Sequence, residues 1–316
     1  MFLGSLFADG DEIPFAPAEE SIEDFRQFGS DEIGPHKLAC IEKILSDTSK
    51  TKDPSYQLSR AILNIQADDA DYIPKVSHAG QIIEENNQSY QLMHNGVKIV
   101  KDCYYDVPWI TDVIYALRGH HEPQEEKVFY EVLKYIPENA TMIELGAYWG
   151  YYSLWFSSAI PGARNYLIEP DLKRLNAGRK NFQLNGREGF FYRGYAAIKD
   201  NDDADFTGAR QILIDSFLKE EGIDHVNILH ADIQGAEYEM LQSCIESIKQ
   251  DKIDYFFIST HHSWIHDACL NFLILWDFQI IAVHRDSESC SGDGLIVARR
   301  KEIPGPENVQ IKRYSP

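Results

Sequence analysis

The sequence predicts an α/β fold built on a doubly wound, mostly parallel sheet with an antiparallel final strand. Three observations lead to this class. From Thr141 onward, apolar strand-like runs alternate with segments of helical spacing. The first of these strands runs directly into a glycine-bearing turn, Gly146 to Gly150. The last two strands are separated by only a few residues around Gly292-Asp293-Gly294, which is too short for a parallel crossover.

The expected elements follow from where the apolar runs begin and end. Strands are expected at 141–145, 165–169, 190–195, 226–231, 255–260, 279–284 and 295–299. Helices are expected near 150–160, 171–184, 236–249 and 264–275. A further helix should precede the first strand, because one helical face carries Val128, Phe129, Val132, Leu133 and Ile136.

The first part of the chain differs in composition. Residues 1–90 hold 17 acidic and 7 basic residues, so half of the net charge of −20 lies in them. Two runs of helical spacing begin at His36 and Tyr56, and Asn95-Gly96 between two β-type runs predicts a hairpin. We therefore divide the chain into an acidic helical accessory segment (1–88), a hairpin with a connecting helix (89–119), the main α/β domain (120–300) and a C-terminal tail (301–316).

Composition also limits the classes of function. A hydrophobic content of 44% supports a packed core, and the net charge of −20 argues against nucleic acid or an anionic membrane surface as a partner. The five cysteines are scattered without a CxxC pair, so neither a disulfide framework nor a zinc cluster is expected. No apolar run reaches transmembrane length, and the first residues lack the basic start of a signal peptide, so we expect a cytoplasmic protein.

The segment from Glu144 to Glu169 predicts a nucleoside-binding unit. A strand, a glycine turn, a helix and a second strand that ends in an acid can hold a ribose, because the acid accepts hydrogen bonds from the ribose hydroxyls. Gly146 and Gly150 are spaced GxxxG rather than GxGxxG, which argues against a pyrophosphate and therefore against a dinucleotide. Glu144 suits a ligand that carries an ammonium or sulfonium group, such as S-adenosylmethionine.

An ordered series of further strings resembles one family. After IELGAYWGYYS and IEPD come LNG, AIKD, ILIDSFLKEEG, VNILHADIQGAEYEML and FFISTHH. Together they resemble the FkbM family of S-adenosylmethionine-dependent methyltransferases over about residues 120–300, and DIQGAEYEML is the most specific string. The resemblance implies a class I (Rossmann-like) methyltransferase fold, S-adenosylmethionine as methyl donor, and O-methylation of a hydroxyl on a sugar, glycan or polyketide-type small molecule.

The resemblance also implies a set of cofactor-binding residues. Glu144, Gly146 and Gly150 would contact the methionine half of the cofactor, and Glu169 would hold its ribose. The predicted cofactor set is completed by Ala147, Tyr148, Pro170, Asp232 and Glu122. The chain departs from the family pattern at three places, where Tyr148 replaces Asn, His230-Ala231 stands where a Lys is common, and Ser259 replaces an acid.

The predicted catalytic residues follow the fourth and fifth strands of the main domain. Methyl transfer is an in-line displacement on an activated methyl group, so alignment and a base for the acceptor hydroxyl are the main requirements. We predict His261 as the base and Asp232 as its partner, with His262 as the alternative because adjacent strand residues point to opposite faces. Asp232 could instead cap the following helix or share a divalent metal with a histidine, but no metal is predicted, because magnesium prefers oxygen ligands.

Several alternatives stay open at this point. The polar residues 120–124 are either a helix cap or a wall of the cofactor site. An NAD-dependent oxidoreductase is disfavoured by the GxxxG spacing, and a non-catalytic methyltransferase-like subunit is disfavoured by the intact acids Glu144, Glu169 and Asp232. The acceptor is expected to be a small molecule or a glycan, and the sequence leaves a homo-oligomer open.

Overall fold

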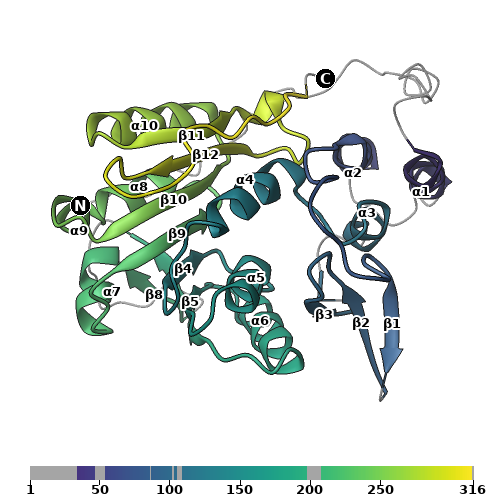
Figure 1. Ribbon diagram of the computed structural model, residues 1–316, viewed down its shortest axis with the longest axis horizontal. Coiled ribbons are helices and arrows are strands. Elements are labelled where there is room, and N and C mark those ends of the chain that lie inside the picture. Colours follow the sequence, from purple (N-terminus) through teal and green to yellow (C-terminus); the bar gives the residue numbers. More distant parts are fainter. Residues whose placement is uncertain are drawn as a thin grey trace, which may run out of the picture.

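The computed structural model describes residues 34–46, 54–85, 87–101, 103–104, 109–197 and 208–314. The acidic opening, residues 1–33, and residues 198–200 of the AIKD string lie outside this range. The largest sheet has seven strands in the order β11-β12-β10-β9-β4-β5-β6 (Figure 1). Its strands are β4 (Thr141–Leu145), β5 (Arg164–Ile168), β6 (Phe190–Tyr192), β9 (Val226–Asp232), β10 (Ile253–Thr260), β11 (Gln279–His284) and β12 (Gly294–Arg299).

Strand direction and order define the fold class. β4 pairs in parallel with β5 and β9, β9 with β10, and β5 with β6, whereas β12 is antiparallel to both β10 and β11. The chain proceeds from β4 to β5 and β6 on one side and returns to β9 on the other side of β4. This reversal creates a switch point between β4 and β9, where open α/β sheets bind their ligands. The predicted class I methyltransferase architecture, including its antiparallel final strand, is confirmed.

Helices cover both faces of the sheet, as a doubly wound fold requires. One face packs against α4 (Pro123–Leu133), α5 (Tyr151–Ala159) and α6 (Leu172–Leu184). The other packs against α7 (Ile214–Glu220), α8 (Glu237–Gln242), α9 (Ile245–Lys249) and α10 (Ser263–Leu275). Neighbouring strand residues alternate between the two cores: Met142 and Leu167 face the first, and Ile143 and Ile168 face the second.

The elements formed by the described residues between 34 and 116 lie at one end of the main domain (Figure 1). Helices α1 (Pro35–Ser46), α2 (Pro54–Gln66) and α3 (Ile110–Ala116) share a small core that includes Ile41, Ile62 and Val113. Strands β1 (Ile82–Glu85), β2 (Gln88–Leu92) and β3 (Lys98–Val100) form an antiparallel sheet. The hairpin predicted from Asn95-Gly96 is therefore present, and β1 adds a strand that the sequence pattern did not predict.

Two predicted elements are divided in the structure. The expected strand 190–195 splits into β6 and β7 (Gly194–Ala196), because β7 pairs with β8 (Arg210–Ile212) outside the main sheet. The expected helix 236–249 splits into α8 and α9 at Ser243. The Ser243 hydroxyl accepts a hydrogen bond from the Ile214 N–H, and its carbonyl accepts one from the Asp215 N–H. These bonds to the start of α7 replace the bonds that a continuous helix would make.

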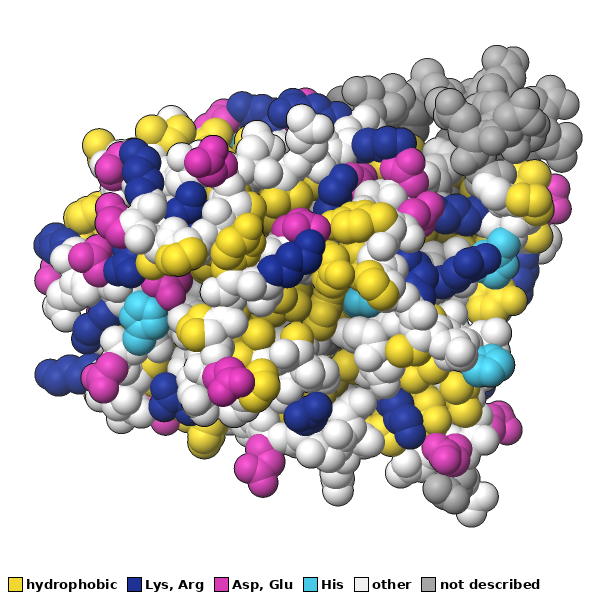
Figure 2. All heavy atoms as spheres, in the orientation of Figure 1, with side chains coloured by type: hydrophobic (Ala, Val, Ile, Leu, Met, Phe, Trp, Pro, Cys, Tyr) yellow, Lys and Arg dark blue, Asp and Glu magenta, His cyan; other side chains and the backbone are white. Residues whose placement is uncertain are grey.

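Charged side chains of both signs lie on the surface. On the face shown in Figure 2, Lys and Arg side chains are interspersed with Asp and Glu, without a continuous basic tract. Within the described residues, no helix has the length and apolar character needed to cross a bilayer.

Two asparagines of α6 attach the small sheet to the main domain. Asn181 accepts a hydrogen bond from the Val100 N–H at 2.9 Å and donates one to the Trp149 carbonyl at 2.9 Å. Asn185 accepts a hydrogen bond from the Lys98 N–H at 2.9 Å and donates one to the Lys98 carbonyl at 2.7 Å. Their side chains pair with the backbone of β3 as a neighbouring strand would.

We predict that Asn181→Ala lowers the free energy of unfolding by about 1–3 kcal/mol, because it leaves backbone groups without their partner. Urea denaturation followed by fluorescence measures the change. Asn176→Ala, at an exposed position of the same helix, is the matched control and should change stability by less than about 0.5 kcal/mol. Equal effects of the two substitutions would show that Asn181 does not join the two parts.

Candidate active site

A cavity of about 540 Å³ opens at the switch point of the sheet. One end is lined by Glu169, Pro170 and Tyr195, which follow β5 or belong to β7. The other end is lined by residues that lie far apart in the sequence: Arg60, Trp109, Glu122, Asp232 and Asp293. The cavity therefore joins the predicted nucleoside end to a second, carboxylate-rich end.

The glycine turn forms part of the cavity wall. Gly146 has a φ of +72°, and a Cβ atom there would lie 1.7 Å from the carbonyl oxygen of Asp232. The N–H groups of Gly146 and Ala147 both donate to the Ile168 carbonyl, which fixes the turn to the end of β5. A side chain at position 146 cannot be accommodated without moving β9, so glycine is required there.

The second glycine of the turn has a different role. Gly150 is the N-cap of α5, with a φ of +71°, and a Cβ there would press on the side chains of Leu167 and Phe182. It does not line the cavity. Gly150 therefore permits close packing of α5, whereas Ala147 and Tyr148 line the cavity itself.

Glu169 lies where a ribose-binding acid is expected. Its two carboxylate oxygens accept hydrogen bonds from the Tyr148 N–H at 3.1 Å and the Asp171 N–H at 2.9 Å. Burial raises the pKa of Glu169, and these two bonds oppose that shift. Each oxygen retains a further lone pair toward the cavity, which Glu169 lines together with Pro170.

Glu144 is a second buried carboxylate on the cavity wall. It accepts a hydrogen bond from the Ser153 N–H at 3.1 Å, and only 4% of the residue is exposed. Burial raises the pKa of Glu144 to about 7. A cationic group bound beside it would favour the ionised form, as the sequence analysis expected for an ammonium group.

Asp232 and His261 lie together at the carboxyl edge of the sheet. The Nε2 atom of His261 is 3.2 Å from Asp232, and its Nδ1 atom is 2.8 Å from Oε1 of Glu237. Burial alone would lower the pKa of His261, but the hydrogen bonds to Asp232 and Glu237 raise it to about 10. Burial opposes ionisation of Asp232, yet its hydrogen bond with His261 holds the pKa of Asp232 below its usual range.

The DIQGAE string builds this pair. Gln234, with a φ of +55°, donates to Asp232 at 3.0 Å. Glu237 accepts hydrogen bonds from both the Gly235 N–H and His261. The helix after this turn starts at Glu237 with Ala236 as its N-cap, and no side chain caps it. Asp232 therefore does not act as the helix cap that the sequence left open.

His262 takes no part in this arrangement. It is exposed, it forms the N-cap of α10, and it does not line the cavity. His261 itself is absent from the cavity lining, but it lies against three residues that line it, Asp232, Gln234 and Asp293. The two histidines thus point to different surroundings, as neighbouring residues at a strand end should.

The polar residues before α4 form part of the cavity wall. Glu122 and His121 line the cavity, with His121 Nε2 3.3 Å from Oε2 of Glu122. The Tyr152 hydroxyl donates to Glu122 at 3.1 Å. Glu126 accepts hydrogen bonds from the N–H groups of His121 and Glu122, so it caps the helix from within. Residues 120–124 therefore include both part of the cavity wall and part of the helix cap, the two alternatives that the sequence left open.

Sequence reasoning missed two long-range pairs in the cavity wall. Glu125 of α4 accepts a bond from His230 Nε2 at 2.7 Å and one from the Ser259 hydroxyl at 3.0 Å. Burial alone would lower the pKa of His230, but Glu125 raises it to about 9. Arg60 of α2 lies 3.2 Å from Asp293 of the β11–β12 loop. The only sequence signal for the contacts of Glu125 was that His230 and Ser259 differ from the family pattern. No local pattern indicated the pair of Arg60 and Asp293.

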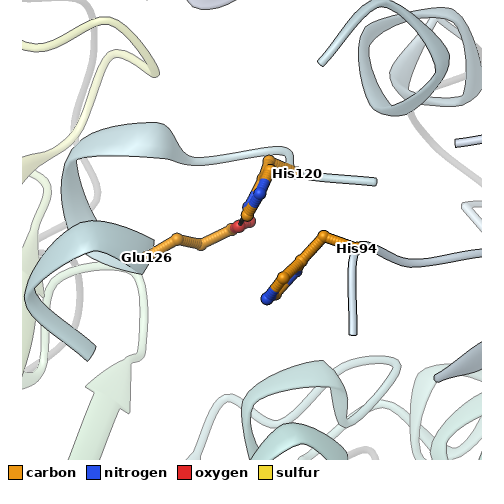
Figure 3. A group of neighbouring side chains, drawn as sticks. All are labelled: His94, His120 and Glu126. Carbon is orange, nitrogen blue, oxygen red and sulfur yellow. Dashed lines mark hydrogen bonds and ion pairs between the residues drawn. The ribbon is translucent and has the colours of Figure 1, made fainter. Parts of the chain in front are cut away.

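A third buried group, His94, His120 and Glu126, has ligand-type atoms within 4.8 Å of one another. Figure 3 shows the carboxylate of Glu126 against the ring of His120. The rings of His94 and His120 are stacked, with centroids 4.0 Å apart and an interplanar angle of 18°. Because an imidazole binds a metal in its ring plane, stacked rings do not direct lone pairs at one ion. His94 also bonds to the Tyr151 hydroxyl at 2.9 Å, so the group is better described as a hydrogen-bonded network.

Comparisons with known proteins were made for the whole chain. A methyltransferase FkbM from Methylobacillus flagellatus KT is similar at 17% identity, with 64% of this chain and 56% of that chain covered and a TM-score of 0.43. A precorrin-6y C5,15-methyltransferase from Geobacter metallireducens GS-15 is similar at 10% identity, with 56% and 88% covered and a TM-score of 0.39. No curated protein matches.

The family comparison agrees with the site. Residues 144–280 match the methyltransferase FkbM domain, which is narrower than the 120–300 expected from the sequence strings. The match includes the glycine turn, Glu169, Asp232 and His261. Residues 144–280 thus carry the match to the methyltransferase FkbM domain, and the strand order of the sheet is that of a class I, S-adenosylmethionine-dependent methyltransferase fold.

Proposed function

We propose that this chain transfers the methyl group of S-adenosylmethionine to a hydroxyl group on a small molecule, sugar or glycan. The observation that carries the proposal is the single cavity that joins Gly146 and Glu169 at one end to Glu122, Asp232 and Asp293 at the other. A donor and an acceptor bound in it would be adjacent, which is the requirement for in-line transfer. Incubation with methyl-labelled cofactor and a panel of hydroxylated acceptors tests the proposal by detection of labelled ethers.

The residues at the Gly146 end fit the cofactor. Glu144 places a buried carboxylate beside the turn, where it would pair with the ammonium group of the methionine half. Glu169 retains lone pairs for the two ribose hydroxyls. Bound there, the cofactor supplies a methyl group on a positively charged sulfur, and the carboxylates of the cavity favour that charge.

The other end of the cavity fits an acceptor. Arg60, Trp109 and Ile110 come from the helical part that precedes the FkbM domain and line this end. We therefore propose that the accessory segment, predicted as residues 1–88, and the α3 region shape the acceptor pocket.

Asp232 and His261 would align the acceptor. Asp232 lines the cavity and can accept a hydrogen bond from the acceptor hydroxyl. Both ring nitrogens of His261 face carboxylates, and its raised pKa keeps the ring protonated near neutral pH. A protonated imidazole has no lone pair for the acceptor proton, so we assign His261 the role of holding Asp232 in place.

We predict that Glu169→Gln weakens binding of S-adenosylhomocysteine by about 1–3 kcal/mol, because the ribose loses a charged acceptor. The amide keeps the shape of the side chain but has one acceptor oxygen, so the N–H of Tyr148 or of Asp171 loses its partner, and thermal unfolding of the variant is compared with that of the wild type. Isothermal calorimetry measures the change, and Glu138→Gln on an exposed position is the control. Unchanged affinity in Glu169→Gln would refute the ribose assignment.

We predict that His261→Ala lowers turnover roughly 10²-fold, because Asp232 loses the group that positions it, and small misplacements have effects of this size. The pKa of Asp232 should rise in this variant, since the charge and hydrogen bond of His261 lower it. His262→Ala, next along the chain and outside the cavity, should keep turnover within a few-fold. A larger loss in His262→Ala would mean that the roles of the two histidines are exchanged.

We predict that Arg60→Ala raises the KM for the acceptor while affinity for S-adenosylhomocysteine stays within about two-fold, because Arg60 belongs to the acceptor end. Steady-state kinetics and calorimetry separate the two effects. Arg118→Ala, an exposed arginine outside this cavity, should leave both values unchanged. A parallel loss of cofactor affinity in Arg60→Ala would argue against an acceptor wall built by the helical segment.

A further inference from the structure

We propose that Glu122 is the general base that takes the proton of the acceptor hydroxyl. The inference rests on the proposed function and gives Glu122 a role in the reaction in place of the cofactor contact expected from the sequence. Glu122 precedes the segment that matches the FkbM domain, so this base would come from outside it.

The position of Glu122 meets the geometric requirement for a base. It lines the cavity at the same end as Asp232 and Asp293, and 23% of its side chain is exposed there. The main chain before α4 is fixed, because the Glu122 N–H donates to Glu126 and Pro123 begins the helix. The Tyr152 hydroxyl bonds to Oε2 of Glu122 at 3.1 Å, which orients the carboxylate and leaves lone pairs for an acceptor.

The other carboxylates at this end each have a basic partner, as Glu122 has His121 at 3.3 Å. Glu125 is held by His230 and by the Ser259 hydroxyl. Asp293 pairs with Arg60, and Asp232 pairs with His261. His261 holds the pKa of Asp232 below its usual range, which makes Asp232 a weak base. Both oxygens of Glu125 already accept hydrogen bonds. Burial raises the pKa of Asp293, so Asp293 is set apart by its ion pair with Arg60 and not by a low pKa.

The surroundings of Glu122 bring its pKa into the range that a general base needs. Burial raises the pKa of Glu122 to about 7; His121 opposes this shift, while Glu125, Asp232 and Asp293 add to it. These groups come from the same loop, from α4, from the end of β9 and from the β11–β12 loop, and Tyr152 of α5 completes the surroundings. Proton transfer is most efficient when the pKa of the base lies near the working pH.

The proton and the electrons balance in one step. The O–H bond of the acceptor breaks and its proton passes to the Glu122 carboxylate. The electron pair of the oxygen forms the new bond to the methyl carbon, and the carbon–sulfur bond breaks with its electrons retained on sulfur. The positive sulfur and the negative carboxylate thereby both become neutral, and Glu122 later returns its proton to solvent.

The central test is Glu122→Gln, which keeps the shape of the side chain and removes its basicity. We expect turnover to fall by roughly 10²–10⁴-fold, the range for loss of a general base. Affinity for S-adenosylhomocysteine should stay within a few-fold. Wild-type turnover should rise with pH through about 7 as Glu122 loses its proton, and the variant should lack this rise. Glu131→Gln, on the same helix and outside the cavity, is the matched control and should behave as wild type.

Acceptor acidity provides a second readout that a structural role would not change. An acceptor with a more acidic hydroxyl needs less help from a base, so Glu122→Gln should lose less activity with a phenol than with an alcohol. Glu122→Asp keeps a carboxylate, so it should retain the rise of turnover with pH at reduced rate. It also tests the proposal if Glu122→Gln fails to fold.

Two outcomes would overturn the assignment. Wild-type turnover in Glu122→Gln would show that another group accepts the proton. A loss of S-adenosylhomocysteine affinity that matches the loss of turnover would return Glu122 to the cofactor site. Failure of the proposed function is distinguishable, because it would appear as unchanged cofactor affinity in Glu169→Gln and no labelled ether from wild-type protein.

Discussion

The close contact between the turn at Gly146 and the carbonyl of Asp232 is the constraint on which the site depends. Glycine permits the ends of β4 and β9 to approach this closely, because a Cβ at position 146 would overlap the Asp232 carbonyl oxygen. The same turn bonds to Ile168 at the end of β5. The turn at Gly146 therefore contacts the ends of β5 and β9 as well as following β4, and the cavity lies at this edge of the sheet.

Several carboxylates are buried beside the cavity and the helices around it, and histidine side chains offset the cost of burying their charge. A buried charge is costly unless it has a partner, and here Glu125 has His230, Glu126 has His120, and Glu237 has His261. The His230–Glu125 pair shows the consequence for pH. Because the pKa of His230 is raised to about 9, the stabilisation from the pair is present below about pH 6.5 and is lost as the pH rises through about 9.

The sequence predicted the elements whose causes are local. Alternating apolar runs and turn residues located the strands of the main sheet, and Asn95-Gly96 located the hairpin because its backbone requirement is confined to two residues. The glycine turn and Glu169, which line one cavity, were predictable as neighbours for the same reason, since they lie within one βαβ unit. The break at Ser243 was not predictable, because it depends on bonds from the start of α7, which lies about thirty residues earlier.

The acceptor end depends on contacts between distant segments, and this sets the limit of sequence reasoning. Arg60 and Asp293 meet across more than two hundred residues, and Glu125 meets His230 across about a hundred. The protonation of His261 is also a tertiary property, because it needs Asp232 and Glu237 on two sides of the ring. The strand and turn motif thus forms the proposed cofactor end, while segments outside the motif contribute to the proposed acceptor end. In this chain those segments are α2, α3 and the start of α4, so its choice of acceptor should depend on residues that the family match does not include.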